Sequence, residues 1–208
     1  MSRNDNATDL KAVHRPLYTA RPTPALVTAP PLPFLTADGS GDPDGPGYRE
    51  AVEGLYAVAY GVRAALKGAG LPPYPVMPLQ GLWWSDRRED FAAGGDRSRW
   101  QWRMMILQPP QADPGQVADA IAAAVRKGRA GAERVRLETF DEGLAAQILH
   151  IGPYADEPAT HRRLMAFIEA EGCEVAGDHH EIYLSHPART APEKLRTILR
   201  YPVRRTRA

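Results

Sequence analysis

Residues 179–187 combine side chains that can do chemistry with the pattern of a β-strand, His-His-Glu-Ile-Tyr-Leu-Ser-His-Pro. The β-branched and aromatic residues favour a strand, and Pro187 ends it. Because side chains alternate along a strand, Glu181 shares a face with His179 and Tyr183. A carboxylate enclosed among aromatic rings is costly unless it is paired. Glu181 is therefore either a working group or part of the solvent face of an amphipathic strand.

All four tryptophans lie in two apolar segments that the pattern predicts to pair as antiparallel strands. Trp100 and Trp102 share a face with Met104, whereas the adjacent Trp83 and Trp84 point to opposite faces. Core packing explains any single tryptophan. Four indoles on two strands exceed the usual need of a core, so we expect at least one to line a cavity for a flat or lipophilic ligand.

The composition argues against several function classes. The 26 basic and 25 acidic side chains leave a net charge of +1, which provides no field for nucleic acid or an anionic membrane. The single cysteine, Cys173, rules out an internal disulfide and suits a reducing cytosol. The chain has no apolar run of about 18 residues and no apolar N-terminal segment, so we expect a cytoplasmic protein without signal peptide or membrane span.

Hydrophobic spacing and capping residues predict the secondary structure. A polar, proline-containing tail with little regular structure is expected at 1–24. Helices are predicted at 48–67, 113–127, 156–171 and 193–199. A strand pair interrupted by prolines is predicted at 26–35. Single strands are predicted at 76–85, 99–108, 135–140, 143–151, 174–176 and 179–186. The segments 135–140 and 143–151 are expected to form a hairpin, and the last two strands to pair with each other.

The order strand, helix, strand, strand occurs at 26–108 and again at 143–186, without convincing identity between the two passes. It predicts an α+β domain over residues 25–208 with antiparallel sheet and two β-α-β-β halves, at about 25–110 and 130–208. The tryptophan strands and the acidic strand occupy matching places in the halves. If a pseudo-two-fold relates the halves, these strands can face one another across a central ligand cleft.

Short motifs in a specific order extend this interpretation. They are found at 34–39, 77–84, 100–105, 150–154, 180–187 and 192–199. Together they resemble the GyrI-like small-molecule-binding family, in its stand-alone branch, and the resemblance covers the chain from about residue 10. It implies tandem β-α-β-β modules of the SHS2 type with a cleft between them.

The resemblance also implies a function. In relatives fused to helix-turn-helix domains, the cleft senses lipophilic, often cationic drugs through a buried glutamate and a ring of aromatics. Stand-alone members are associated with hydrolysis of cyclopropane-bearing DNA-alkylating natural products. The family glutamate falls on Glu181, and Gln80 stands where we expect a carboxylate in many relatives. The aromatics that match the cleft are Trp83 or Trp84, Trp102, Tyr154 and Tyr183.

We therefore predict a hydrolase that uses neither metal nor cofactor, in which Glu181, with its pKa raised by burial, activates water. Tyr154 or Tyr183 would donate a hydrogen bond to the ligand carbonyl or developing phenolate. The ligand, a lipophilic aromatic or cationic small molecule, would bind a monomer or dimer of the protein. The predicted ligand-binding residues are Trp83, Trp84, Trp102, Met104 and His179.

Other functions fit parts of the pattern. A non-catalytic drug sensor or sequestering protein would pair Glu181 with a cationic ligand, helped by cation–π contacts. A metal hydrolase would need His179, Glu181 and another histidine such as His150, but their spacing is not compact. The sequence lacks a nucleophile elbow, a glycine-rich phosphate loop and a dinucleotide-binding motif.

Overall fold

The computed structural model describes residues 10–72, 74–87 and 95–206. Two compact units are present, and each combines segments that are far apart in the sequence. Unit 1 is formed mainly by residues 32–77 and 83–140. Unit 2 is formed by 14–31, by 78–82 and by the chain from 141 onward.

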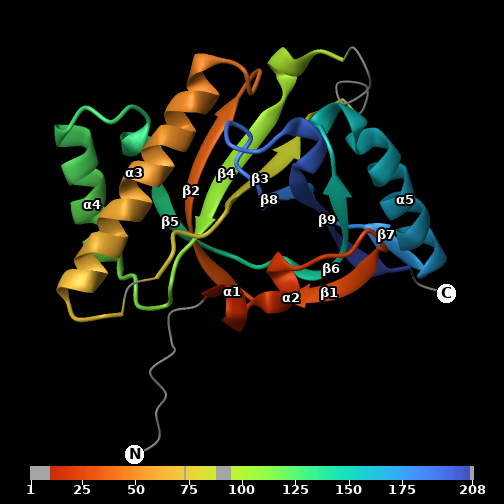
Figure 1. The fold of residues 1–208 in the computed structure, drawn as a ribbon, viewed down its shortest axis with the longest axis horizontal. Coiled ribbons are helices and arrows are strands. Elements are labelled where there is room, and N and C mark those ends of the chain that lie inside the picture. Colours follow the sequence, from red (N-terminus) through yellow and green to blue (C-terminus); the bar gives the residue numbers. More distant parts are fainter. Residues whose placement is uncertain (1–9, 73, 88–94, 207–208) are drawn as a thin grey trace, which may run out of the picture. The chain divides into compact units, whose positions relative to one another are not determined.

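Unit 1 is an antiparallel sheet with two helices. Strand β2 (Leu32–Ser40) lies between β4 (Gln101–Leu107) and β5 (Arg136–Phe140). Helices α3 (Pro46–Gly68) and α4 (Pro114–Arg126) lie side by side (Figure 1). The buried stripe of α3 recurs at three- and four-residue spacings, as expected for one apolar face: Ala51, Leu55, Val58, Val62 and Leu66.

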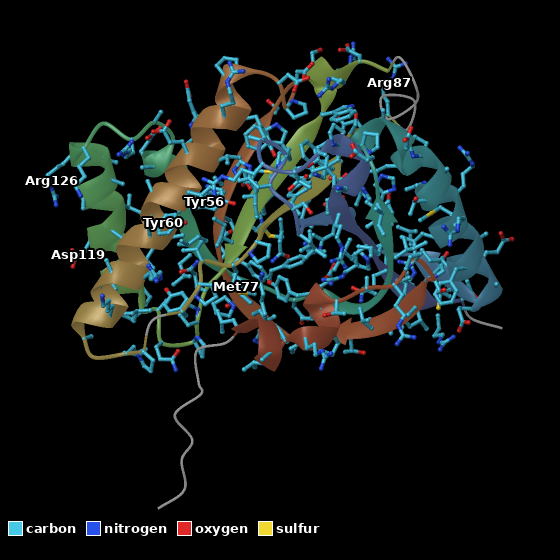
Figure 2. The ribbon with its side chains drawn as sticks, viewed as in Figure 1. Tyr56, Tyr60, Met77, Arg87, Asp119 and Arg126 are labelled. Carbon is cyan, nitrogen blue, oxygen red and sulfur yellow. The ribbon has the colours of Figure 1, made fainter. Side chains whose placement is uncertain are left out.

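The outer side of α3 carries two tyrosines. Tyr56 and Tyr60 are four residues apart, so their rings stack one helical turn from each other, with centroids 6.4 Å apart (Figure 2). Tyr60 is largely exposed, whereas Tyr56 is half-buried. This pair therefore belongs to the surface of unit 1 and not to its core.

Unit 2 contains antiparallel strands in the order β1-β6-β9-β8-β3, with β7 paired to β9. Helix α5 (Glu157–Ala170) packs on these strands. The strands are β1 (Ala25–Ala29), β6 (Gly143–Ile151), β7 (Cys173–Val175), β8 (His179–Tyr183) and β9 (Arg196–Arg205). Strand β3 (Leu79–Trp84) contributes its first four residues to unit 2, while Trp83 and Trp84 belong to unit 1.

The α+β class with antiparallel sheet is confirmed, as are the three long helices. The start of α4 shows why capping signals worked: Asp113 accepts hydrogen bonds from the Gly115 and Gln116 amides, and Gln116 completes a capping box. Pro114 occupies the first helical position, where a backbone N–H would have no acceptor within the helix. Proline has no N–H and therefore suits this position.

Three predicted strand pairings are wrong. The segment 26–35 forms β1 and β2, which pair with β6 and with β4 and β5 rather than with each other. Strand β5 pairs with β2 and β6 with β1 and β9, so they form no hairpin. Strands β7 and β8 both pair with β9. In each case adjacency in sequence suggested that the two strands pair with each other, whereas each of them forms its backbone hydrogen bonds with other strands.

The predicted helix at 193–199 is also wrong. Only Pro192–Lys194 form a 3₁₀ turn, and Arg196 begins β9, which is paired on both sides. The proline and acid at 192–193 indicated a helix start. The following run, from Thr197 to Arg200, is buried at every position, which suits a central strand and leaves no polar helix face.

The N-terminal segment has more structure than predicted where it is described. Residues Leu10–Val13 and Arg15–Tyr18 form the short helices α1 and α2. Leu17 and Tyr18 are buried, and the Gln147 side chain donates to the Pro16 and Thr19 carbonyls. The predicted tail at residues 1–9 lies outside the described residues.

Candidate functional site

Strand β8 presents Glu181 on the sheet face that α5 covers. Glu181 is opposite Leu199 of β9, and directly opposite residues of antiparallel strands share a face. Leu199 belongs to a core cluster with Leu164 and Ile168 of α5. The predicted alternation along β8 is therefore confirmed, and the Glu181 face is the one that packs on α5. It is not the solvent face of an amphipathic strand.

Glu181 is held by a histidine of its own strand. His179 Nε2 lies 3.0 Å from Glu181 Oε1, and the two side chains are only 16% and 14% exposed. The His179 ring lies against the Tyr201 ring of β9, with centroids 4.8 Å apart. His179 Nδ1 is buried and bonds to no described residue. This contact holds the Glu181 carboxylate in one orientation on a packed strand.

Two tyrosines flank the carboxylate. Tyr154, in a 3₁₀ turn before α5, packs edge-to-face on Tyr183 of β8, with centroids 6.2 Å apart. Burial raises the pKa of Tyr154 to about 12, with smaller contributions from Glu181 and Glu157. Tyr154 therefore keeps its hydroxyl proton at neutral pH and can donate it in a hydrogen bond.

A second carboxyl group, Glu157, lies at this site and was not predicted from sequence. Burial, and then the charge of Glu181, raise the pKa of Glu157 to about 9. Its position as first residue of α5 favours the charged form, but a helix N-terminus contributes about 1 kcal/mol or less, under one pKa unit. Desolvation and the neighbouring carboxylate therefore dominate, and Glu157 holds a proton at neutral pH.

His161 closes the same region from α5. Its Nε2 lies 2.9 Å from the Tyr201 hydroxyl, and its ring packs edge-on against the His179 ring at 5.9 Å. Burial, followed by the charges of His179 and Arg162, lowers the pKa of His161. We call the set His179, Glu181, Tyr183, Tyr201, Tyr154, Glu157 and His161 the α5–β8 site.

His150 fixes the turn that carries Tyr154 and Glu157. Its Nε2 donates to the Pro153 carbonyl at 3.1 Å, and its Nδ1 bonds the Thr160 hydroxyl of α5 at 2.9 Å. Both ring nitrogens are thus engaged away from Glu181, which does not favour the metal alternative. Among the residues described, no three His, Cys, Asp or Glu side chains are grouped to hold a metal ion.

The opposite face of the unit 2 sheet holds a buried polar network. Glu142 is bonded by His180 Nδ1 at 2.7 Å and by Arg200 Nη1 at 2.9 Å. His180 Nε2 also lies 2.9 Å from the Gln80 amide oxygen, and the Gln80 amide donates to the Tyr18 hydroxyl. Gln80, where a carboxylate was expected in many relatives, is therefore part of this network and on the face opposite Glu181.

The tryptophans form an aromatic cluster within unit 1. Tyr48 of α3 stacks on Trp83, at 5.9 Å, and packs edge-on against Trp102, at 5.4 Å. Trp102 is buried and donates to the Gly41 carbonyl; Met104 is fully buried, and Trp84 is half-buried. Ligand contact by Trp83, Trp84, Trp102 or Met104 stays a prediction, because these contacts are those of a packed interior.

The α5–β8 site brings together two carboxyl groups in different surroundings. Glu181 has an imidazole partner, whereas burial and the charge of Glu181 raise the pKa of Glu157. Carboxyl groups whose surroundings separate their pKa values can act as base and acid in one reaction. The arrangement suits proton transfer on a bound small molecule.

Comparison with known proteins identifies the family. The family model of the GyrI-like small molecule binding domain matches residues 22–204. The chain belongs to the GyrI-like family. No match to a curated protein was found.

Three solved structures from Listeria innocua are similar over 95% of this chain. An uncharacterized conserved protein is 36% identical, with TM-score 0.88 and 100% of its own length covered. Two hydrolases are 35% and 34% identical, with TM-scores of 0.83 and 0.85 and 100% and 99% of their lengths covered. Within the described part of this GyrI-like chain, no helix is long and apolar enough to span a membrane.

Proposed function

We propose that this protein binds a lipophilic aromatic small molecule at the α5–β8 site and adds water to an electrophilic cyclopropane ring of that molecule. The observation that supports this most directly is Glu181, an enclosed carboxylate held by His179 and flanked by tyrosine rings. The similarity to two Listeria hydrolases supports hydrolysis in general. The reaction would remove a DNA-alkylating compound before it reached DNA.

The proposed step is an addition without a leaving group. Glu181 takes a proton from water while the water oxygen forms a bond to a cyclopropane carbon. One carbon–carbon bond of the ring breaks, and its electron pair moves through the conjugated ring to the carbonyl oxygen. A dienone thereby becomes a phenolate, which takes up one proton to give a phenol, while the proton on Glu181 is released, so the product has gained one water. Tyr154 or Tyr183 would hydrogen-bond the oxygen that gains the electrons.

The test uses a flat aromatic compound that carries a cyclopropane fused to a dienone. Wild type, Glu181→Gln and the exposed control Glu193→Gln are incubated with it, and mass spectrometry follows the gain of one water. The amide keeps the shape of the side chain but cannot accept the proton, so Glu181→Gln should bind within a few-fold and lose turnover by about 100-fold or more. Hydrolysis by Glu181→Gln at the wild-type rate would show that the mechanism is wrong.

A non-catalytic role as sensor or sequestering protein is the alternative. It is favoured by the two carboxyl groups and the tyrosine rings, which could hold a lipophilic cation. Lipophilic cations and strained electrophiles are incubated with the protein in parallel. Tight binding of cations, with no compound gaining water, would favour this role over hydrolysis.

A further inference from the structure

Glu157 has a feature that the proposed step does not use. Its Oε1 atom is buried and bonds to no other described residue. Buried carboxyl oxygens are normally hydrogen-bonded, and an exception calls for an explanation. Helix α5 begins at Glu157 and is joined to β6 by the His150–Thr160 bond, so the backbone that carries this side chain is held in place. The missing partner is an atom that a bound molecule can supply.

The surroundings determine which atom that is. Glu157 faces Glu181 on β8 and Tyr154 in the preceding turn, and two further histidines, His179 and His161, lie around Glu181 and Tyr201. Among the described residues, no cation forms an ion pair with Glu157, and its neighbour Glu181 repels a second charge. Glu157 therefore stays a neutral acid, and its hydroxyl can donate a hydrogen bond to an acceptor atom of a bound molecule.

We propose that Glu157 is the proton donor of the α5–β8 site. It first donates a hydrogen bond to the ligand oxygen that gains electrons as the ring opens, and then transfers its proton to that oxygen. The inference rests on the proposed function and adds a catalytic residue to it. Tyr154, which interacts electrostatically with both acids, would orient the same oxygen.

The protons balance over one turnover. Glu181 gains the proton that water loses, and Glu157 loses the proton that the new phenol gains. After product release, the proton returns from Glu181 to Glu157, directly or through the Tyr154 hydroxyl. The cycle consumes one water and needs no oxidant, reductant or cofactor.

The pH profile of turnover is the decisive measurement. Since only the protonated acid can donate, kcat should fall as pH rises through the raised pKa of Glu157, about 9. Glu157→Gln should lower kcat by about 100-fold and abolish this alkaline decline. Glu157→Asp keeps an acid and should retain the decline at reduced rate. Glu169→Gln, on the exposed side of α5, is the matched control and should behave as wild type.

A second measurement separates this inference from the proposed function. Titration of ¹³C-labelled glutamate carboxyls in free wild-type protein should show Glu157, assigned through Glu157→Gln, with a raised pKa that falls in Glu181→Gln. Titration of Glu157 in the ordinary acidic range, or an unchanged kcat profile in Glu157→Gln, would overturn the donor role alone. Absence of any water-gaining product with wild type would overturn the proposed reaction and this role with it, whatever the titration shows.

Discussion

At the scale of single residues, the tightest fit in unit 1 joins a glycine to a tryptophan. Gly39 of β2 is directly opposite Trp102 of β4, and the Trp102 ring lies over the glycine. A Cβ at Gly39 would lie 2.1 Å from Trp102 Cη2, closer than any real Cβ contact. Trp102 is fully buried and cannot turn aside, so only glycine fits at this position.

We predict that Gly39→Ala lowers the free energy of unfolding by about 1–3 kcal/mol, because the new methyl group overpacks the interior. Gly47→Ala is the control: it lies in α3 with no atom within 4 Å of its added Cβ, and alanine suits a helix. Denaturant unfolding of both variants measures the difference. Equal stability of Gly39→Ala and wild type would contradict this account of Trp102.

The residues that β8 contributes to the α5–β8 site could be predicted from the sequence. The strand pattern placed His179, Glu181 and Tyr183 on one face, because strand alternation is a local property. Glu157 could not be found this way. A glutamate at the first position of a helix ordinarily faces water and complements the helix dipole. Its burial depends on how α5 packs against β8, which no spacing within the sequence records.

At the scale of elements, the three long helices followed their local signals, whereas one short helix and three strand pairings did not. Helix α3 was predicted from its apolar stripe, and α4 from the cap at Asp113. Strand β9 was mistaken for a helix at its start because Pro192 and Glu193 carry a helix-start signal. Residues 196–205 form a strand because β6 and β8 pair with its two edges. Such long-range partners have no local sequence signature.

The network behind β8 and β9 is the element-scale feature with the largest expected energy. Among the described residues, Arg200 has its ion-pair partner in Glu142, whose side chain is 2% exposed. Although burial opposes the charged form, His180 and Arg200 lower the pKa of Glu142 to about 2. The network also ties α2 to the sheet, because Arg200 donates to the Leu17 carbonyl.

We predict that Glu142→Gln lowers the free energy of unfolding at pH 7 by about 3–5 kcal/mol, since it leaves Arg200 buried without its counter-charge. The folded-state pKa is below the unfolded value of 4.5, so the stabilisation is present above about pH 4.5 and is lost as pH falls toward 2. Urea unfolding between about pH 2 and 7 should show that loss in wild type and a flatter profile in the variant.

The control for this prediction is Glu174→Gln, which removes an exposed ion pair with Arg204. Surface pairs contribute about 1 kcal/mol or less, so this variant should follow the wild-type profile. An equal effect of the two substitutions would mean that the Glu142 network does not stabilise unit 2.

At the scale of the whole molecule, each unit is assembled from separate stretches of chain. Unit 2 needs residues 14–31 and 78–82 in addition to its C-terminal part. The predicted halves, about 25–110 and 130–208, divide the chain once and so differ from these units. The β-α-β-β order within each half was visible in the sequence. The pairing of β1 with the distant strand β6 could not be predicted, because the apolar residues of β1 fit any strand partner.

We predict that residues 130–208 expressed alone do not form a stable fold. The fragment lacks β1, which pairs with β6 over five residues, and it lacks the Leu17 carbonyl and the Gln80 amide that bond Arg200 and His180. Amide spectra should be poorly dispersed, in contrast to the full chain. A fragment that joins residues 14–31 to 141–208 through a flexible linker restores β1 and α2 and should recover part of the dispersion. A well-dispersed spectrum of 130–208 alone would show that the C-terminal half folds by itself and that the distant segments are not required for its fold.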